Sequence, residues 1–402
     1  MILKNSLGST RVQYILRASP CASHPALVRF DELQRAILGR ISNCELSDQH
    51  WMQANLPVRS GGLGIRSVVL LAPSAFLASA AATLPTQAAL LPVNFQPRDG
   101  FAEGVAGIWS ARYSCPTPDA GHAVKQRSWD EASIQHALQC LLGSCSDDVS
   151  KARLLAAQAP HSGDWLNAMP VSSCGLRLDD EAVRVAIGLR LGVNLCAPHR
   201  CPCGALVDAL GIHGLSCRRS AGRTTRHNML NDIIFRACIR SGVPASKEPT
   251  GLFLNDEKRT DGMTLVPWKM GRCVTWDVTC PDTLAASHRQ ITAYASGAAS
   301  ERAAMLKHIK YQAVKAVHNF VPIAVETLGP INNEGMIFLR ELGGRLSTAS
   351  RDPRETSFLF QRVSVCMQRA NAIAFRGSFS DLYEVPDDDI YLTANFQNTQ
   401  GT

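Results

Sequence analysis

The amino-acid sequence predicts a mixed α/β protein with a largely helical N-terminal part. Apolar residues recur at helical spacing in the first ninety residues, for example at Leu27, Phe30 and Leu33. In the C-terminal half the pattern changes to helix, strands, helix, strand and helix, which is the element order of an α/β layer. Between these parts, closely spaced cysteines and a histidine indicate a metal-bound module.

Length and composition describe an ordinary globular chain. With 402 residues it can form two or three domains. A content of 46% hydrophobic and 19% charged residues excludes a disordered, collagen-like or coiled-coil protein. Fourteen cysteines follow a start that lacks the apolar core of a signal peptide. We therefore expect an intracellular chain whose cysteines are reduced thiols or metal ligands rather than disulfides.

One long segment without charge raises the question of a membrane span. No charged residue occurs between Arg66 and Arg98. The segment contains Pro73, Pro85 and Pro92, and much of its apolar character comes from alanine. A span needs about 20 strongly apolar residues, so this composition favours packed helices. We expect no membrane partner.

The chain is expected to divide into five parts. Residues 91–128 are rich in proline and glycine and predict a linker or a loosely packed connection. Two helices are expected after it, at 129–142 and 180–191. The five parts are a helical region at 1–90, a linker with helices at 91–195, a zinc knuckle at 196–222, an α/β domain at 223–380 and a flexible polar tail at 381–402.

The elements of the α/β domain follow from apolar periodicity and from turn residues. A helix at 225–240 is expected to stop at Gly242 and Pro244. The connection Lys269-Met270-Gly271 predicts a hairpin between the two extended segments that it joins. The expected elements after the first helix are extended segments at 251–255, 263–268 and 272–279, a helical stretch at 285–320, a strand at 321–326, and helices at 333–346 and 355–375.

The pattern C-x-C-x9-H-x3-C predicts a zinc site. Its members are Cys201, Cys203, His213 and Cys217. Three thiolates and an imidazole are the ligands of a closed tetrahedral structural zinc site, so we expect Zn²⁺ to be bound here. Cys196 is an alternative ligand. Buried cysteines and a hydrogen-bonded histidine without metal are the other interpretation of the same residues.

Most of the excess positive charge lies around this pattern. The net charge of the chain is +7, and residues 196–247 contain eight basic and two acidic side chains. Lysine and arginine beside phosphates release condensed counterions, so a polyanion is the expected partner, although a solvated basic surface has the same composition. The arginines expected to contact nucleic acid are Arg218, Arg219, Arg223 and Arg226.

Two aspartates and two lysines in the C-terminal half could act together. Asp261 precedes an expected strand, and Asp277 lies inside the β-rich run 274–279, where a buried carboxylate requires a partner or a metal. Carboxylates on neighbouring strands can hold Mg²⁺, which would activate water and neutralise charge at a phosphate. Lys307 and Lys310 on the next helix are the candidates for a catalytic lysine. Otherwise, Asp261 caps a turn, Asp277 pairs with an arginine and both lysines are solvated.

Several short segments are similar to one protein family. They are Arg259-Thr260-Asp261-Gly262, Trp276-Asp277-Val278-Thr279 and Lys307-x-x-Lys310-Tyr311, together with residues 211–219, 361–365 and 56–65. These segments resemble the C-terminal part of the reverse-transcriptase polyproteins of certain non-LTR retrotransposons. In that family a Cys-Cys-His-Cys zinc knuckle precedes a restriction-like PD-(D/E)XK endonuclease domain, and residues 1–90 resemble the thumb of the reverse transcriptase.

The resemblance implies a fold and a function. It implies a PD-(D/E)XK core in 223–380, with Asp261 and Asp277 as Mg²⁺ ligands and Lys310, or else Lys307, as the catalytic lysine. The activity implied is metal-dependent nicking of target DNA. The partners are DNA and also the element's RNA, in the nucleus, without a small-molecule cofactor. Thr279 takes the place of the lysine in D/E-x-K, so that the lysine comes from the helix. No Asp-Asp pair of a polymerase palm is present, so no polymerase activity is expected.

Two other functions fit the same residues. The first is a catalytically inactive module whose zinc knuckle and arginines bind nucleic acid, while the nuclease fold only supports them. Thr260 favours this interpretation, because the family usually has proline there. The second is a degenerate fragment of a retroelement whose apolar faces, shaped for a missing polymerase, favour aggregation.

Overall fold

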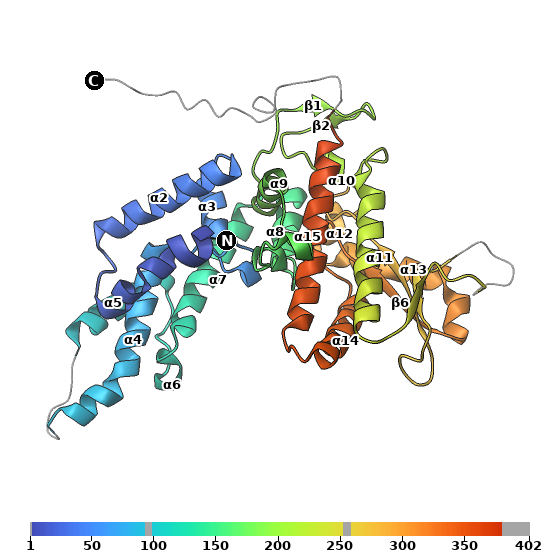
Figure 1. The fold of residues 1–402 in the computed structure, drawn as a ribbon. Coiled ribbons are helices and arrows are strands. Elements are labelled where there is room, and N and C mark those ends of the chain that lie inside the picture. Colours follow the sequence, from blue (N-terminus) through green and yellow to red (C-terminus); the bar gives the residue numbers. More distant parts are fainter. Residues whose placement is uncertain (1, 93–98, 252–258, 380–402) are drawn as a thin grey trace. The chain divides into compact units, whose positions relative to one another are not determined.

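The fold was analysed in a computed structural model that describes residues 2–92, 99–251 and 259–379. It has a helical majority with two small sheets, which is a mixed α/β composition, as the sequence predicts. The chain forms two compact units (Figure 1). The N-terminal unit comprises Met1–Ile41 and Leu46–Cys145, and the C-terminal unit comprises Ser42–Glu45 and Ser146–Thr402.

In the described residues of the N-terminal unit, all regular secondary structure is helical. Its α-helices are α1 (Gln13–Ala18), α2 (Pro25–Ser42), α3 (Asp48–Asn55), α4 (Val68–Leu90), α5 (Gly100–Tyr113), α6 (Ala120–Ala123) and α7 (Gln126–Ser144). Short π and 3-10 turns lie at Leu3–Leu7, Ser9–Arg11 and Val58–Ser60. The expected helical character of residues 1–90 and the expected helix at 129–142 are confirmed.

The prediction of a linker at 91–128 is wrong for residues 100–113, which form α5. Asp99 caps this helix by accepting hydrogen bonds from the backbone N–H groups of Phe101 and Ala102. Trp109 of α5 is buried and packs edge-to-face on Trp129 of α7, with ring centroids 5.0 Å apart. The helix therefore belongs to the core of the unit. The prolines and glycines on either side of it led to the incorrect prediction of a linker.

Helix α4 is long and apolar enough to cross a membrane, by length and composition alone. It is the one such helix among the described residues. Half of its most apolar window is buried inside the unit, against residues such as Leu16 and Trp109. The core helix of a soluble protein has the same properties, so α4 is weak evidence for a membrane.

The C-terminal unit combines helices with a four-stranded sheet. It begins with α8 (Asp148–Gln158) and α9 (Asp180–Leu191), and the expected helix at 180–191 is confirmed. The further elements are β1 (His199–Arg200), β2 (Leu206–Val207), α10 (His213–Ser216), α11 (Gly222–Arg240), β3 (Ala245–Lys247), β4 (Gly262–Thr264), β5 (Val274–Thr279), α12 (Arg289–Tyr294), α13 (Ala298–Lys310), β6 (Asn319–Ala324), α14 (Asn333–Ser350) and α15 (Glu355–Arg376).

The larger sheet has the strand order β3-β4-β5-β6. The first three strands are antiparallel neighbours, and β5 pairs with β6 in parallel. The predicted hairpin at 269–271 is confirmed, because β4 and β5 are antiparallel around it. Met270 and Gly271 both have positive φ, 52° and 70°, as both central residues of a type I′ turn do. The parallel pair requires a crossover, which α12 and α13 provide.

Side chains alternate between the two faces of β5. Val274, Trp276 and Val278 point into the main core, which they share with residues of α11, α14 and α15. Asp277 points to the opposite face, toward α13. The sequence predicted this alternation, which places a carboxylate on a strand that is almost completely buried.

Several other expected elements differ in extent. The strand expected at 263–268 is β4, which has only three residues, and the helical stretch expected at 285–320 is divided into α12, α13 and the 3-10 turn Gln312–Ala316. The short strand β3 was not predicted. The expected helices at 333–346 and 355–375 are confirmed as α14 and α15. The segment expected to be extended at 251–255 lies outside the described residues except for Gly251, as does the tail from residue 380.

Candidate functional site

The four predicted zinc ligands lie together in the C-terminal unit. The ligand atoms of Cys201, Cys203, His213 and Cys217 are all within 4.8 Å of one another. Cys201 Sγ is 3.7 Å from Cys217 Sγ, and Cys203 Sγ is 3.2 Å from His213 Nε2. Zinc–ligand bonds of 2.0–2.3 Å in a tetrahedron place neighbouring ligands roughly 3.3–3.8 Å apart. The group therefore fits Zn²⁺ without a large rearrangement.

Short local elements bring these ligands together. Strands β1 and β2 form an antiparallel hairpin, and Cys201 and Cys203 lie in its turn. Gly204, with φ 91°, allows the turn to close, and the backbone N–H of Cys201 donates a hydrogen bond to the carbonyl oxygen of Ala205. Helix α10 begins at His213, and Cys217 follows its last turn. The alternative ligand Cys196 is not in the group, since its thiol faces the carbonyl oxygens of Asp208 and Ala209.

The thiols of the group are not equivalent. A backbone hydrogen bond from Ala205, more than any other contact, lowers the pKa of Cys203 to about 6. Burial raises the pKa of Cys201 to about 11. A metal ion binds thiolates, so it would favour the deprotonated form of both cysteines. The chemistry of this donor set, three sulfurs and an imidazole, is that of a structural zinc site.

Three of the four predicted nucleic-acid-binding arginines are exposed beside the zinc ligands. Arg218, Arg219 and Arg223 lie at the surface, and Arg219 donates a hydrogen bond to the carbonyl oxygen of Pro202. Arg226 is different, because it is 1% exposed and donates to the carbonyl oxygen of Leu215 inside the unit. The structure therefore separates the buried Arg226 from the three exposed arginines.

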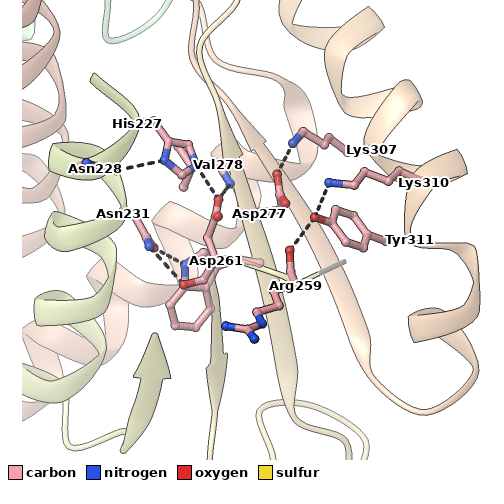
Figure 2. A network of polar contacts seen from close by, with 11 residues as sticks. His227, Asn228, Asn231, Arg259, Asp261, Asp277, Val278, Lys307, Lys310 and Tyr311 are labelled. Atoms are coloured by element: carbon pink, nitrogen blue, oxygen red, sulfur yellow. Dashed lines mark hydrogen bonds and ion pairs between the residues drawn. The ribbon is translucent and has the colours of Figure 1, made fainter. Parts of the chain in front are cut away.

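The two predicted metal-binding aspartates lie on neighbouring segments of the sheet. Gly262 of β4 pairs with Trp276 of β5, and Asp261 and Asp277 are the next residues of these two segments. The backbone N–H of Asp261 donates to the carbonyl oxygen of Trp276, the residue before Asp277. The charge of Asp261 is close enough to act on the carboxyl group of Asp277. Both carboxylates thus belong to one small region of the sheet (Figure 2).

Asp261 is held by α11 and β5. Its Oδ2 atom lies 2.9 Å from Nε2 of His227 and accepts a hydrogen bond of 2.6 Å from the backbone N–H of Val278. Asn231, one turn after His227 on α11, donates to the carbonyl oxygen of Asp261. The same side chain accepts a hydrogen bond from Nε1 of Trp276. The position of Asp261 is therefore determined by contacts on both sides (Figure 2).

Asp277 forms an ion pair with one of the two candidate lysines. It is 3% exposed, and its Oδ2 atom lies 2.5 Å from Nζ of Lys307 on α13. Lys310 instead donates to the hydroxyl of Tyr311, which donates to the carbonyl oxygen of Arg259. Figure 2 shows both lysines on the side of the sheet that Asp277 faces. The geometry therefore distinguishes the lysines, with Lys307 in direct contact with a carboxylate.

The surroundings of Asp277 favour its protonated form. Burial is the main cause that raises the pKa of Asp277, the negative charge of Asp261 raises it further, and Lys307 opposes both effects. The hydrogen bond with Asp261 raises the pKa of His227. A divalent cation beside Asp277 would favour its ionised form and so oppose the effects of burial and of Asp261.

Glycine is required at the residue after Asp261. A Cβ atom on Gly262 would lie 2.1 Å from the ring of Trp276, whose side chain is completely buried. The indole thus fills the place of a side chain on β4. This close approach keeps the β4 backbone against β5, and hence Asp261 beside Asp277.

Sequence reasoning did not assign roles to His227 and Asn231. They lie one turn apart on α11, next to the buried Leu230 and Ile234. Two polar residues at i and i+4 beside an apolar helical face were the available signal. That signal does not identify Asp261, 34 residues after His227, as their common partner.

The chain was compared with known proteins. A scan against protein-family models finds no match, and a search of curated proteins finds none either.

Proposed function

We propose that the C-terminal unit is a Mg²⁺-dependent DNA endonuclease that nicks one strand, in a protein of the non-LTR retroelement type. One observation carries the proposal: Asp261, directly before β4, lies beside Asp277 on the adjacent strand β5, and Lys307 contacts Asp277. Two carboxylates can hold a divalent cation, and a lysine beside them can stabilise the negative charge that develops on the phosphate. The sheet flanked by helices is compatible with the PD-(D/E)XK core that the sequence resemblance implies.

The carboxylates fit a hard divalent cation. The oxygen atoms of Asp261 and Asp277 would hold Mg²⁺, whose charge would offset the effect of the Asp261 carboxylate on Asp277. When bound, Mg²⁺ supplies Lewis acidity that activates a water and neutralises charge on the scissile phosphate. His227 and Val278 would keep Asp261 oriented through the contacts they already make with its carboxylate.

Lys307 would act on the phosphate and the attacking water. Its ammonium group can donate hydrogen bonds to the water and to a non-bridging oxygen as negative charge develops there. Attack by the water oxygen forms a new phosphorus–oxygen bond, and the bond to the leaving oxygen breaks. The proton lost by the water passes to solvent, and the leaving oxygen takes up a proton.

The zinc group and its arginines would bind the DNA. Arg218, Arg219 and Arg223 are exposed beside a group of ligands that can hold zinc and make the surface rigid. Cationic side chains of this kind bind phosphates without reading sequence. The element's RNA is a second polyanion that the same surface would bind. A location in the nucleus follows from the proposed substrate.

The first test is nicking of a supercoiled plasmid by the full chain loaded with zinc. We expect open circles to accumulate when Mg²⁺ is added and not when it is left out. Omitting Mg²⁺ is preferable to adding a chelator, because a chelator would also remove zinc. Absence of nicking by a folded, zinc-loaded protein that binds the plasmid would contradict the proposal.

That result would favour a second function, an inactive module that binds nucleic acid. The exposed arginines beside the zinc ligands support this function independently of the carboxylates. Asp277→Asn separates the two functions, because only a nuclease depends on this carboxylate.

The two lysines are expected to differ in their effect on nicking. Replacing Lys307 with methionine should lower the nicking rate by about 100-fold or more, because it removes a donor next to Asp277. Replacing Lys310 with methionine should lower it by about tenfold or less, because Lys310 contacts Tyr311 instead.

The pair of variants provides its own control, since both remove one positive charge from the same helix. Rates are measured under single turnover at saturating plasmid, so that weaker binding does not enter. The opposite order of effects would assign the catalytic role to Lys310.

A further inference from the structure

A second cationic surface lies on α11, away from the zinc ligands. An open groove of about 750 Å³ is lined by side chains on one face of α11 and of α15, and also by residues of β3 and residues 174–175. Helices α11 and α15 pack side by side along this groove (Figure 1). The basic side chains that line it are Arg236, Arg240, Lys247, Arg362 and Arg369.

These five cations are not balanced by the carboxylates beside them. Arg236 and Lys247 share Asp232, at 2.5 and 2.7 Å. In the same way, Arg240 and Arg362 share Glu355, at 2.9 and 3.3 Å. Arg369 donates to the neutral carbonyl oxygens of Gly175 and Arg177. Two carboxylates thus form ion pairs with four cations, and the fifth cation, Arg369, contacts only uncharged groups among these contacts.

The cations are partly exposed, so a ligand can reach them. The side chain of Arg236 is 75% exposed, and those of Arg240 and Lys247 are 51% and 40% exposed. The positive charge of Arg240, after burial, lowers the pKa of Arg362. Repulsion between these guanidinium groups therefore remains despite Glu355. An anion in the groove would relieve it.

The length of the groove fits a chain of phosphates rather than a single one. Its lining on α11 runs from Asn228 to Arg240, which at 1.5 Å per residue is roughly 18 Å. Phosphates along one strand of a duplex follow one another at about 3.4 Å of helix axis, so roughly five of them span this distance. Apolar side chains, Met229 and Ile233 among them, form part of the lining between the charges.

We propose that the groove between α11 and α15 binds the phosphate backbone of a nucleic-acid strand. One end of the groove is at Asn228, the residue after His227, which contacts Asp261. A strand in the groove would therefore pass close to the carboxylate site at that end. The inference goes beyond the proposed nuclease and does not depend on it, because an inactive binding module would use the groove in the same way.

The test compares two double variants of the zinc-loaded full chain. In the groove variant, Arg236→Gln and Arg369→Gln remove two cations. These two arginines were chosen because their loss leaves no carboxylate without a cation. Asp232 still forms its ion pair with Lys247, and the buried Glu355 pairs with other arginines. In the control, Arg302→Gln and Arg340→Gln remove the same charge from exposed positions on α13 and α14. Binding of a short labelled single strand and of the matching duplex is measured by fluorescence anisotropy, with zinc and without Mg²⁺.

We expect the groove variant to raise Kd about tenfold for the form of nucleic acid that occupies the groove, while the control stays near wild type. The slope of log K against log salt should become shallower by roughly 1.4 for a single strand or 1.8 for a duplex, as for two lost phosphate contacts. The form whose slope changes identifies the natural ligand.

Two outcomes would overturn the inference. The first is an equal Kd and an equal slope for the groove variant and the control. The second is displacement of the labelled strand by a polyglutamate peptide as effectively as by unlabelled nucleic acid, which would indicate an acidic protein segment as the occupant. Failure of the nuclease proposal would look different, since Asp277→Asn would then leave nicking unchanged while the groove variant still weakened binding.

Discussion

Replacing Asp277 with asparagine is expected to reduce Mg²⁺-dependent nicking by at least about 1,000-fold. The substitution keeps the volume of the side chain but removes a charge that would hold the metal, and metal catalysis contributes several kcal/mol to such a reaction. The carboxylate is 3% exposed and contacts Lys307. The rate of conversion of supercoiled to open circular plasmid is the measurement.

A matched control shows whether loss of any buried carboxylate has the same effect. Asp282 is also buried, and its oxygen accepts hydrogen bonds from Thr327 and from the backbone of Leu284. Asp282→Asn, if folded, should keep the nicking activity, because Asp282 makes these contacts away from Lys307. Loss of activity in both variants to the same degree would point to a structural effect, and full activity of Asp277→Asn would reject the proposed site.

Metal binding can be measured separately from nicking. Ligands that bind only the folded state stabilise it by RT ln(1 + [L]/Kd), which is about 2.7 kcal/mol at one hundred times Kd. Mg²⁺ should therefore raise the Tm of the wild-type protein and leave that of Asp277→Asn nearly unchanged. A rise of equal size in both proteins would show that Mg²⁺ binds elsewhere.

Local patterns predicted those parts of the site that depend on neighbouring residues in the chain. Alternation along 274–279 placed Asp277 opposite the core face, and the turn at 269–271 paired β4 with β5. The spacing C-x-C-x9-H-x3-C predicted four ligands that the structure brings within 4.8 Å. Each of these predictions uses the geometry of one strand, one turn or one short segment.

Contacts between distant segments were not predictable. Arg226 belongs to a basic stretch in the sequence, yet tertiary packing buries it against the carbonyl oxygen of Leu215. Helices α11 and α15 are far apart in the chain, so the pattern of neither one indicates that Arg236 and Arg369 line the same groove. Composition likewise gave no sign that α5 packs into a core through Trp109. In all three cases, contacts with a segment distant in the sequence determine where the residue lies and what it can bind, and the local sequence pattern does not.

Removal of the zinc ligands is expected to destabilise the C-terminal unit by several kcal/mol. Cys217→Ser should abolish zinc binding, measured as roughly one zinc per chain lost from the reduced protein, and should lower Tm by about 10 °C. The effect should extend beyond the hairpin, because α10 packs closely on α15: a Cβ atom on Gly214 would lie 2.6 Å from the carbonyl oxygen of Ala374. Cys140→Ser removes an exposed thiol outside the zinc group and should change neither quantity.

The loss of zinc should also affect the carboxylate site, through α11. Arg226, near the start of this helix, donates to the carbonyl oxygen of Leu215 in α10, and His227 follows it directly. If α10 loosens, the contact of His227 with Asp261 should weaken, so nicking by Cys217→Ser should fall even where the protein remains folded. Zinc content and Tm equal to those of the wild type would reject the zinc site. Loss of zinc with normal nicking would show instead that the zinc group and the carboxylate site are independent.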